Sequence, residues 1–168
     1  MKPSRLWIYR LLTAVMPESR LYGFKRQLAR WCGIRIGKNV RIHSSAVFYG
    51  TGALELGDNV WIGPGCFIAS IAPAKVTIGA NCDFGPYVTV LTGTHEIDPM
   101  GEHIAGEGKA FSVEIGNGCW LGARSLILPG VNLAKKTLVA AGSVVVESCE
   151  KNCTLIAGVP AIQKKVLA

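Results

Sequence analysis

Aliphatic residues recur at every sixth position over much of this chain. The longest run begins at Ile115 and is followed by five aliphatic residues at the same spacing: Leu121, Ile127, Leu133, Val139 and Val145. Shorter runs with this spacing precede it: Ile36 and Ile42; Leu56, Ile62 and Ile68; Ile78, Phe84 and Val90. Glycine or alanine follows most of these residues, and polar or small residues fill the remaining positions.

A spacing of six fits neither the 3.6-residue period of a helix nor the simple alternation of an isolated strand. It is typical of short strands joined by sharp turns, in which the aliphatic side chain points inward and glycine relieves the bend. Three such units make one triangular coil. Stacked coils pair their strands in parallel and join the aliphatic residues into one core, so the pattern predicts an all-β parallel β-helix over residues 36–157.

Three segments depart from the repeat. Residues 48–55 and 69–77 are slightly too long and should bulge at corners of the coils. Residues 91–114 fit no repeat, and their glycine and polar residues predict one long protruding loop. A long excursion from a rigid scaffold is a common location for functional residues.

The two ends of the chain differ from the repeat. Residues 4–32 carry apolar residues at helical spacing, and Pro17 should divide them into two helices. We expect residues 1–35 to form a helical cap over the open end of the β-helix, whose strand edges are otherwise unpaired. Residues 158–168 form a tail that should fold back along the outside.

Charge and cysteine content add two expectations. The net charge is +7, and residues 1–40 hold nine Lys and Arg residues against Glu18 alone. This asymmetry suggests an anionic partner such as a membrane surface, although a solvated helical edge explains it equally well. Nucleic acid is not expected, because no binding motif accompanies the charge.

None of the six cysteines forms a CxxC pair, and three recur at one position of the repeat: Cys66, Cys82 and Cys119. There a reduced thiol would pack as a small apolar group, which predicts a reducing compartment. No apolar run is long enough to cross a bilayer. We therefore expect a cytoplasmic protein, with a peripheral contact on the inner face of the membrane as a further expectation.

Three stretches carry a resemblance to a known family. They are Thr92-Gly93-Thr94-His95-Glu96-Ile97-Asp98; Ile115 to Ala123 with Leu128-Pro129-Gly130-Val131; and Ala140 to Val145 with Ala157 to Ala161. Over residues 36–165 the chain resembles the bacterial hexapeptide-repeat acyltransferases. Within that group it is similar to the maltose, galactoside, nodulation and streptogramin acetyltransferases and to polysaccharide O-acetyltransferases.

The resemblance implies a left-handed β-helix, a homotrimer with active sites between subunits, and acetyl-coenzyme A as co-substrate without a metal. It implies that His95 is the general base that removes a proton from a sugar hydroxyl. This assignment agrees with the chemistry, because a hydroxyl is a poor nucleophile at neutral pH and histidine has a suitable proton affinity. Glu96, Asp98 or a backbone carbonyl would orient the ring.

The resemblance also assigns residues to acetyl-coenzyme A. Gly122, Ala123, Ala141 and Gly142 match positions along which the pantetheine arm lies, and an N–H near Ala123 matches the donor to the oxyanion. Trp120 would line the path of the pantetheine arm or only pack between subunits. Lys165 matches a basic position for the phosphates, assisted by others: Lys135, Lys136 and Lys164. The chain departs from the family where Ile162 replaces a second basic residue and Val146-Glu147 replace a Thr-Lys pair.

The acceptor is less well specified. By spacing, the family's acceptor-binding Asn and Asp fall near Gly65 and Pro73, which cannot replace them. Asp83, Tyr87 and Glu96 are the remaining polar candidates, although Asp83 also suits a turn of the repeat. We expect the acceptor to be a sugar of a surface polysaccharide or of its lipid-linked precursor.

Three alternatives remain. A γ-type carbonic anhydrase shares the fold and holds zinc with three histidines, but the H-x4-H pair is missing among His43, His95 and His103. A non-catalytic β-helix scaffold would not need the histidine motif. A serine acetyltransferase would have a long helical N-terminal domain, which this sequence does not contain.

Overall fold

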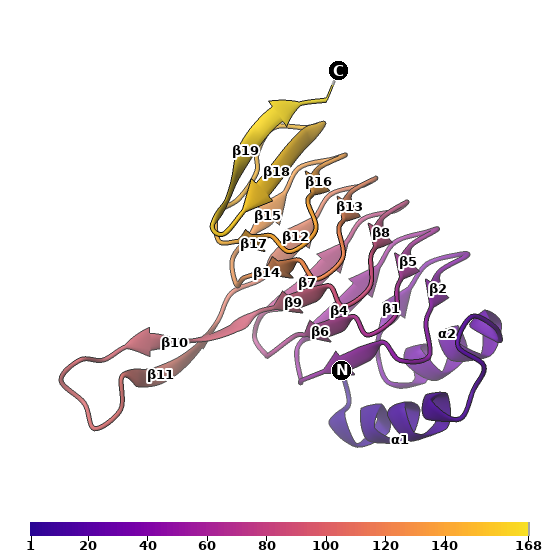
Figure 1. The fold of residues 1–168 in the computed structure, drawn as a ribbon. Coiled ribbons are helices and arrows are strands. Elements are labelled where there is room, and N and C mark those ends of the chain that lie inside the picture. The colour runs from indigo at the N-terminus through magenta and orange to yellow at the C-terminus, as the bar shows by residue number, and fades with distance from the viewer. Residues whose placement is uncertain (168) are drawn as a thin grey trace.

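The computed structural model describes residues 1–167, and its strands form a parallel β-solenoid whose coils stack on one another (Figure 1). Each full coil contributes one strand to each of three sheets. The first sheet contains β1 (Arg35–Ile36), β4 (Ala53–Leu56), β7 (Lys75–Ile78), β12 (Val113–Ile115) and β15 (Asn132–Leu133). The second contains β2 (Arg41–Ile42), β5 (Trp61–Ile62), β8 (Asp83–Phe84), β13 (Trp120–Leu121), β16 (Leu138–Val139), β18 (Thr154–Gly158) and β19 (Ala161–Val166). The third contains β3 (Val47–Tyr49), β6 (Phe67–Ala69), β9 (Thr89–Leu91), β14 (Leu126–Ile127) and β17 (Val144–Val145).

The repeat positions form the core, as the spacing predicts. Every aliphatic or aromatic residue at the repeat position from Ile42 to Val145 is buried, and Ile36 packs half-buried against them. Cys66, Cys82 and Cys119 are buried free thiols. Burial raises the pKa of the Cys66 thiol to about 11, so this side chain packs as a neutral group.

Asparagine forms the turn at one corner of three successive coils. Asn39, Asn59 and Asn81 turn the chain from the first sheet to the second with positive φ, a conformation that asparagine tolerates well. Their side chains continue the stacking, because Asn39 Nδ2 donates to Asn59 Oδ1 at 3.2 Å and Asn59 Nδ2 donates to Asn81 Oδ1 at 2.9 Å. The polar positions of the repeat thus connect neighbouring coils outside the core.

Two helices lie against the first coil: α1 (Pro3–Ala14) and α2 (Tyr22–Trp31). They are separated around Pro17, as predicted. The inward face of α1 buries Leu6, Tyr9 and Thr13, and the Tyr9 ring lies 5.8 Å from the Phe48 ring of β3. The helices cover the N-terminal end of the solenoid (Figure 1).

The predicted long loop is instead an antiparallel hairpin. Its strands are β10 (Gly93–Ile97) and β11 (Ala105–Ala110), and they project from the body between β9 and β12 (Figure 1). The expectation of a loop is therefore corrected. Glycine and polar residues can form a two-stranded ribbon because its backbone groups pair with each other, and no apolar face is needed to mark it in the sequence.

The C-terminal tail folds back on the preceding strand. β19 pairs antiparallel with β18 and extends the second sheet beyond the last coil, next to β17. This strand covers the open edge that β18 would otherwise present. None of the helices in residues 1–167 is long and apolar enough to cross a membrane.

Candidate active site

His95 lies on the hairpin arm close to where the arm leaves the solenoid. Its strand partner is Gly108, and its side chain is exposed. The ring Nδ1 lies 2.9 Å from the carbonyl oxygen of Gly106. A carbonyl oxygen only accepts hydrogen bonds, so Nδ1 carries the proton and donates it. The neutral ring therefore presents the lone pair of Nε2, which is the arrangement that a general base needs.

The two carboxylates near His95 have other partners. Glu96 forms an ion pair with Lys109 across the hairpin, and this contact raises the pKa of Lys109. Asp98 Oδ1 accepts hydrogen bonds from the backbone N–H groups of Met100 at 3.1 Å and Gly101 at 2.9 Å, in the turn of the hairpin. Of the three orienting groups considered from the sequence, the structure thus pairs the ring with a backbone carbonyl.

A pocket of about 350 Å³ lies beside His95 at the corner where the third sheet meets the first. Lys109 contributes a charged side chain to its wall, and most of the other residues are small or apolar. The lining consists of Ile71, Ala72, Pro73, Gly93, Thr94, His95, Gly108, Lys109 and Ala110. Pro73, near which the family's acidic acceptor residue was expected by spacing, does line the pocket but brings no polar side chain.

Four of the predicted cofactor residues gather at a different corner, between the second and third sheets. We call it the Gly122 corner, and these residues are Gly122, Ala123, Ala141 and Gly142. Gly122 and Ala123 lie one coil below Ala141 and Gly142, and the Gly142 N–H donates to the Ala123 carbonyl at 2.9 Å. A Cβ atom on Gly122 would lie 2.5 Å from the Ala141 nitrogen, so the stacking of the coils requires glycine there. Gly142 differs, because a Cβ atom there would meet no atom within 4 Å.

Trp120 and Lys165 lie on the second sheet. Trp120 is 57% exposed on β13, in register with Asp83 on β8 and Leu138 on β16. Lys165 is exposed on β19 and pairs with Leu155. Both residues thus lie on the sheet that runs into the Gly122 corner.

The acceptor candidates Asp83 and Tyr87 do not lie beside His95. Asp83 is exposed on the second sheet, with Trp61 and Trp120 as its strand neighbours. Tyr87 turns the chain at the Gly122 corner with φ of 60°, and the Arg124 guanidinium lies 5.7 Å from its ring centre. In one chain, therefore, only Glu96 of the three acceptor candidates belongs to the His95 arm.

His95 and the Gly122 corner are thus separated within one chain. The hairpin leaves the solenoid at the corner of the third and first sheets and points away from the body (Figure 1). The small residues of the predicted cofactor path lie at the corner of the second and third sheets. A single copy of the chain does not bring the two sets together.

The structure adds three residues that the sequence analysis did not single out. Gly106 holds the His95 ring, Lys109 neutralises Glu96, and Ile71 forms a wall of the pocket. Gly106 and Lys109 are placed by the register of the hairpin, which pairs Gly93 with Ala110. The sequence carries no apolar alternation from which this register can be inferred.

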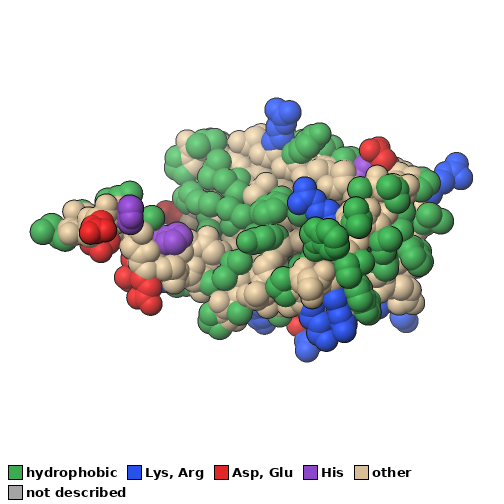
Figure 2. Space-filling model, turned by 90° about the horizontal axis from the view of Figure 1, so that it is seen from below, with side chains coloured by type: hydrophobic (Ala, Val, Ile, Leu, Met, Phe, Trp, Pro, Cys, Tyr) green, Lys and Arg blue, Asp and Glu red, His purple; other side chains and the backbone are tan. Residues whose placement is uncertain are grey.

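The histidines do not form a common site. His43 is buried beneath the helices, and His95 and His103 belong to the arm, on which histidine side chains are visible in Figure 2. Within residues 1–167 no group of three or more His, Cys, Asp or Glu side chains is arranged to hold a metal ion. Nothing in this part of the chain therefore favours the zinc site of a γ-type carbonic anhydrase.

Comparison with known families and proteins gives a consistent picture. The family model described as "Hexapeptide repeat of succinyl-transferase" matches residues 112–147. WcaF of Escherichia coli K12, named for colanic acid biosynthesis as an acetyltransferase, is 32% identical over 142 residues, which cover 84% of this chain and 74% of WcaF. The acetyltransferase YJL218W of Saccharomyces cerevisiae is 36% identical over 102 residues, and the matched region spans about half of that protein (52%) and 58% of this chain.

Solved structures share the fold. The hexapeptide-repeat acetyltransferase VCA0836 of Vibrio cholerae, in complex with acetyl-coenzyme A, superposes with a TM-score of 0.81 at 22% identity, over 98% of this chain and 86% of that one. A galactoside acetyltransferase in complex with coenzyme A superposes with a TM-score of 0.79 at 22% identity, over 98% of this chain and 80% of that one. At these identities the likeness concerns the fold.

Proposed function

Because the chain belongs to the hexapeptide-repeat acetyltransferase family, we propose that it transfers the acetyl group of acetyl-coenzyme A to a hydroxyl of a sugar, with His95 as general base. The observation that carries the proposal is the hydrogen bond from His95 Nδ1 to the Gly106 carbonyl at 2.9 Å. It holds the ring in the tautomer that leaves Nε2 free, on an exposed strand beside a pocket. Acetyl-coenzyme A supplies the acetyl group as a thioester.

The proposed role of His95 accounts for the proton. Nε2 takes the hydroxyl proton as the hydroxyl oxygen bonds to the acetyl carbon, and His95 later returns that proton to the departing sulfur. While the ring is positively charged, its Nδ1–H still donates to the Gly106 carbonyl, whose partial negative charge stabilises the imidazolium. The N–H near Ala123 is the proposed donor to the oxygen that becomes negative.

The Gly122 corner suits a narrow, flexible co-substrate. Ala123, Ala141 and Gly142 present backbone groups with little side-chain bulk, and the space above Gly142 is open. Small residues allow a chain such as pantetheine to approach the backbone closely. We propose that Trp120 flanks this path and that Lys165 meets the phosphates of coenzyme A.

We further propose that the active site forms between copies in a homotrimer. One chain keeps His95 and the Gly122 corner apart, so transfer requires the histidine of one copy and the small-residue corner of another. Closed cyclic symmetry generates identical interfaces of this kind, and three copies complete three sites.

The proposed acceptor is a sugar of a bacterial surface polysaccharide or its precursor, in line with the name of WcaF, a relative for which colanic acid biosynthesis is given. We place the enzyme in the cytoplasm, in peripheral contact with the inner face of the membrane. The support for this contact is the charge of the N-terminal segment, since anionic headgroups attract clustered Lys and Arg residues.

The decisive experiment measures thiol release from acetyl-coenzyme A with a panel of sugars and nucleotide sugars. We expect acceptor-dependent release by the wild type and a loss of roughly 10²- to 10⁴-fold in His95→Ala, the range associated with a general base. His103→Ala is the matched control, because this exposed histidine lies on the same arm but outside the pocket. Release that His95→Ala leaves unchanged would refute the mechanism.

A further inference from the structure

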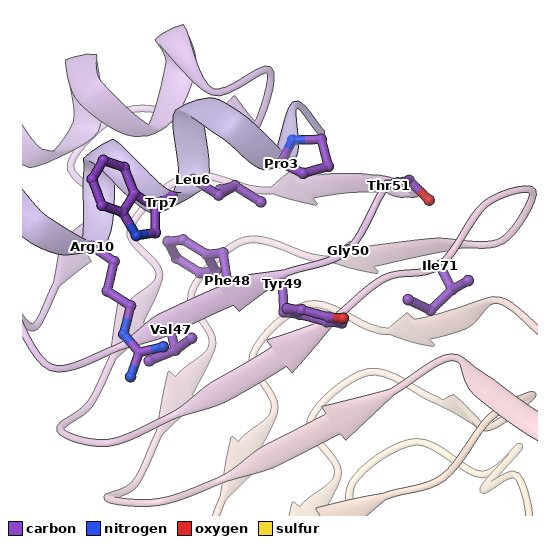
Figure 3. Close-up of a pocket in the computed structure, with 10 residues that line it drawn as sticks. All are labelled: Pro3, Leu6, Trp7, Arg10, Val47, Phe48, Tyr49, Gly50, Thr51 and Ile71. Carbon is purple, nitrogen blue, oxygen red and sulfur yellow. The ribbon is translucent and has the colours of Figure 1, made fainter.

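A groove of about 340 Å³ runs between α1 and β3, away from the Gly122 corner. Its walls are mainly apolar and include three aromatic rings, from Trp7, Phe48 and Tyr49. The full lining is Pro3, Leu6, Trp7, Arg10, Val47, Phe48, Tyr49, Gly50, Thr51 and Ile71. Figure 3 shows Trp7 and Arg10 toward one end of this groove and Thr51 and Ile71 toward the other.

The Ile71 end adjoins the His95 pocket. Ile71 lines both cavities. Its side chain lies against Gly50 on one side and Gly93 on the other, since a Cβ atom on either glycine would come within 3.2 Å of it. The apolar groove and the pocket that holds the proposed base therefore meet at Ile71.

The Trp7 end adjoins an apolar helix face. Trp7, Leu11 and Val15 follow one another at helical spacing and are 68%, 57% and 84% exposed. A second exposed row lies beside them, formed by Ile8 and Leu12. Figure 2 shows hydrophobic side chains gathered at the helical end of the molecule, with Lys and Arg side chains among them. A helix with aromatic and aliphatic residues outward and basic residues nearby is typical of proteins that lie on a membrane surface.

We propose that the groove between α1 and β3 binds the hydrocarbon chain of a lipid-linked sugar, so that the sugar enters the His95 pocket while the far end of the chain remains in the bilayer. The inference rests on the proposed function and specifies its acceptor class. It joins four features in sequence: the exposed face of α1, Trp7, the groove, and Ile71 beside His95.

The size and charge of the groove agree with this occupant. A volume of about 340 Å³ is at the lower end of the range for small-molecule pockets, which suits a segment of one chain. The Arg10 guanidinium, which has no ion pair within residues 1–167, lies at the end next to the α1 face. An anionic lipid headgroup there would complement its charge.

The test compares the binding of octyl β-D-galactoside with that of methyl β-D-galactoside, by calorimetry of the full chain below the micelle concentration. The two probes share a sugar and differ in the apolar chain. Burial of a methylene group strengthens binding by at most roughly fourfold. We therefore expect the octyl compound to bind at least ten times more tightly, and equal affinities would overturn the proposal.

Variants locate the binding. Trp7→Ala removes one wall and Val47→Phe extends a ring into the groove, so each should weaken octyl binding at least fivefold. Leu11→Ala is the matched control on the same helix, because Leu11 is similarly exposed but does not line the groove. An equal loss in Trp7→Ala and Leu11→Ala would indicate adsorption to the outer face of α1 and would overturn the proposal. Binding that appears only in dissociated copies would identify a second copy as the occupant and would also overturn it.

The outcomes separate this inference from the proposed function. His103→Ala should bind the octyl compound as the wild type does, because this exposed histidine lines neither the groove nor the His95 pocket. Sugar acetylation that depends on His95, together with equal binding of the two glycosides, would overturn the proposal that the groove binds a hydrocarbon chain and would leave the proposed function intact. Groove-dependent octyl binding without transfer to any acceptor would count against the proposed function, while the groove would stand as a lipid-binding site.

Discussion

Single glycines at the Gly122 corner have different physical roles although they look alike in the sequence. Gly122 is buried under Ala141, and its backbone must pass close to the next coil. Gly142 has φ of 71° and open space around its Cα. The first glycine therefore serves the packing of the solenoid, whereas the second leaves room that a ligand could use.

We predict that Gly122→Ala lowers the free energy of unfolding by about 1–3 kcal/mol, because the added methyl group would overlap the Ala141 backbone. Gly142→Asn should leave stability nearly unchanged, since asparagine accepts positive φ, but it should raise the KM for acetyl-coenzyme A several-fold. Denaturant unfolding and steady-state kinetics measure the two effects. An unchanged KM in Gly142→Asn would remove this residue from the proposed co-substrate path.

His43 connects the helices to the first coil. Its Nδ1 lies 2.9 Å from Ser45 Oγ, and its Nε2 lies 3.5 Å from Glu18 Oε2. Burial lowers the pKa of His43 below its ordinary value of 6.5; Glu18 opposes this shift and Lys25 adds to it. The folded protein therefore holds the neutral ring, while the unfolded chain takes up a proton near its ordinary pKa.

Because the pKa of His43 is lower in the folded than in the unfolded state, we predict that His43 contributes to the free energy of unfolding above pH 6.5. This contribution is lost as the pH falls through the lower pKa of the folded state. His43→Gln should flatten the dependence of the unfolding midpoint on pH below neutrality. His103→Gln, on the exposed arm, should retain the wild-type slope. Parallel slopes in all three proteins would show that His43 titrates equally in the folded and unfolded states.

At the scale of elements, α1 and the hairpin arm each leave a surface without an intramolecular partner. α1 buries Leu6, Tyr9 and Thr13 against the first coil but exposes its other apolar residues. The arm has only its own two strands to support it. Elements of this kind are the usual sites of intermolecular contact, because their exposed groups gain most from a partner.

We predict that the full chain floats with vesicles of phosphatidylglycerol and phosphatidylcholine at low salt. The double variant Trp7→Ser, Leu11→Ser should lose this binding, because apolar burial and charge attraction act together at an interface. Ile104→Ser is the control, since Ile104 is 66% exposed at the turn of the hairpin, far from the helices in sequence. Failure of the wild type to float would refute the membrane contact.

At the scale of the whole molecule, the separation of His95 from the Gly122 corner has a direct consequence. If sites form between copies, two inactive variants can restore activity when mixed in one oligomer. His95→Ala retains the intact corner, and Gly142→Trp retains the intact histidine. Neither variant alone can build a complete site.

We predict that co-expression of His95→Ala with Gly142→Trp restores about a quarter of wild-type activity. Each site needs an intact His95 from one copy and an intact Gly142 from the neighbouring copy. With random mixing each is present in about half of the cases, so about a quarter of the sites are complete. Sedimentation equilibrium checks that the mixed species are trimers. Activity that stays at the level of the separate variants would mean that each chain forms its own site.

The sequence by itself determined the repeating framework. Spacing of six placed the core residues from Ile42 to Val145, because each repeat must bury one side chain inside the coil and turn at its end. Pro17 marked the division between the two helices. These features follow from local chemistry repeated along the chain, and local chemistry is readable from the order of residues.

Only the tertiary structure decided how the arm, the tail and the site are arranged. Three features involve residues outside the six-residue repeat. They are the hydrogen bond of His95 to Gly106, the position of Ile71 in the walls of two cavities, and the position of β19 at the end of the second sheet. Such contacts depend on strand register and corner geometry, and a glycine-rich ribbon has no apolar alternation to specify its register. The repeat therefore predicts the scaffold, whereas backbone pairing in three dimensions determines what surrounds the histidine.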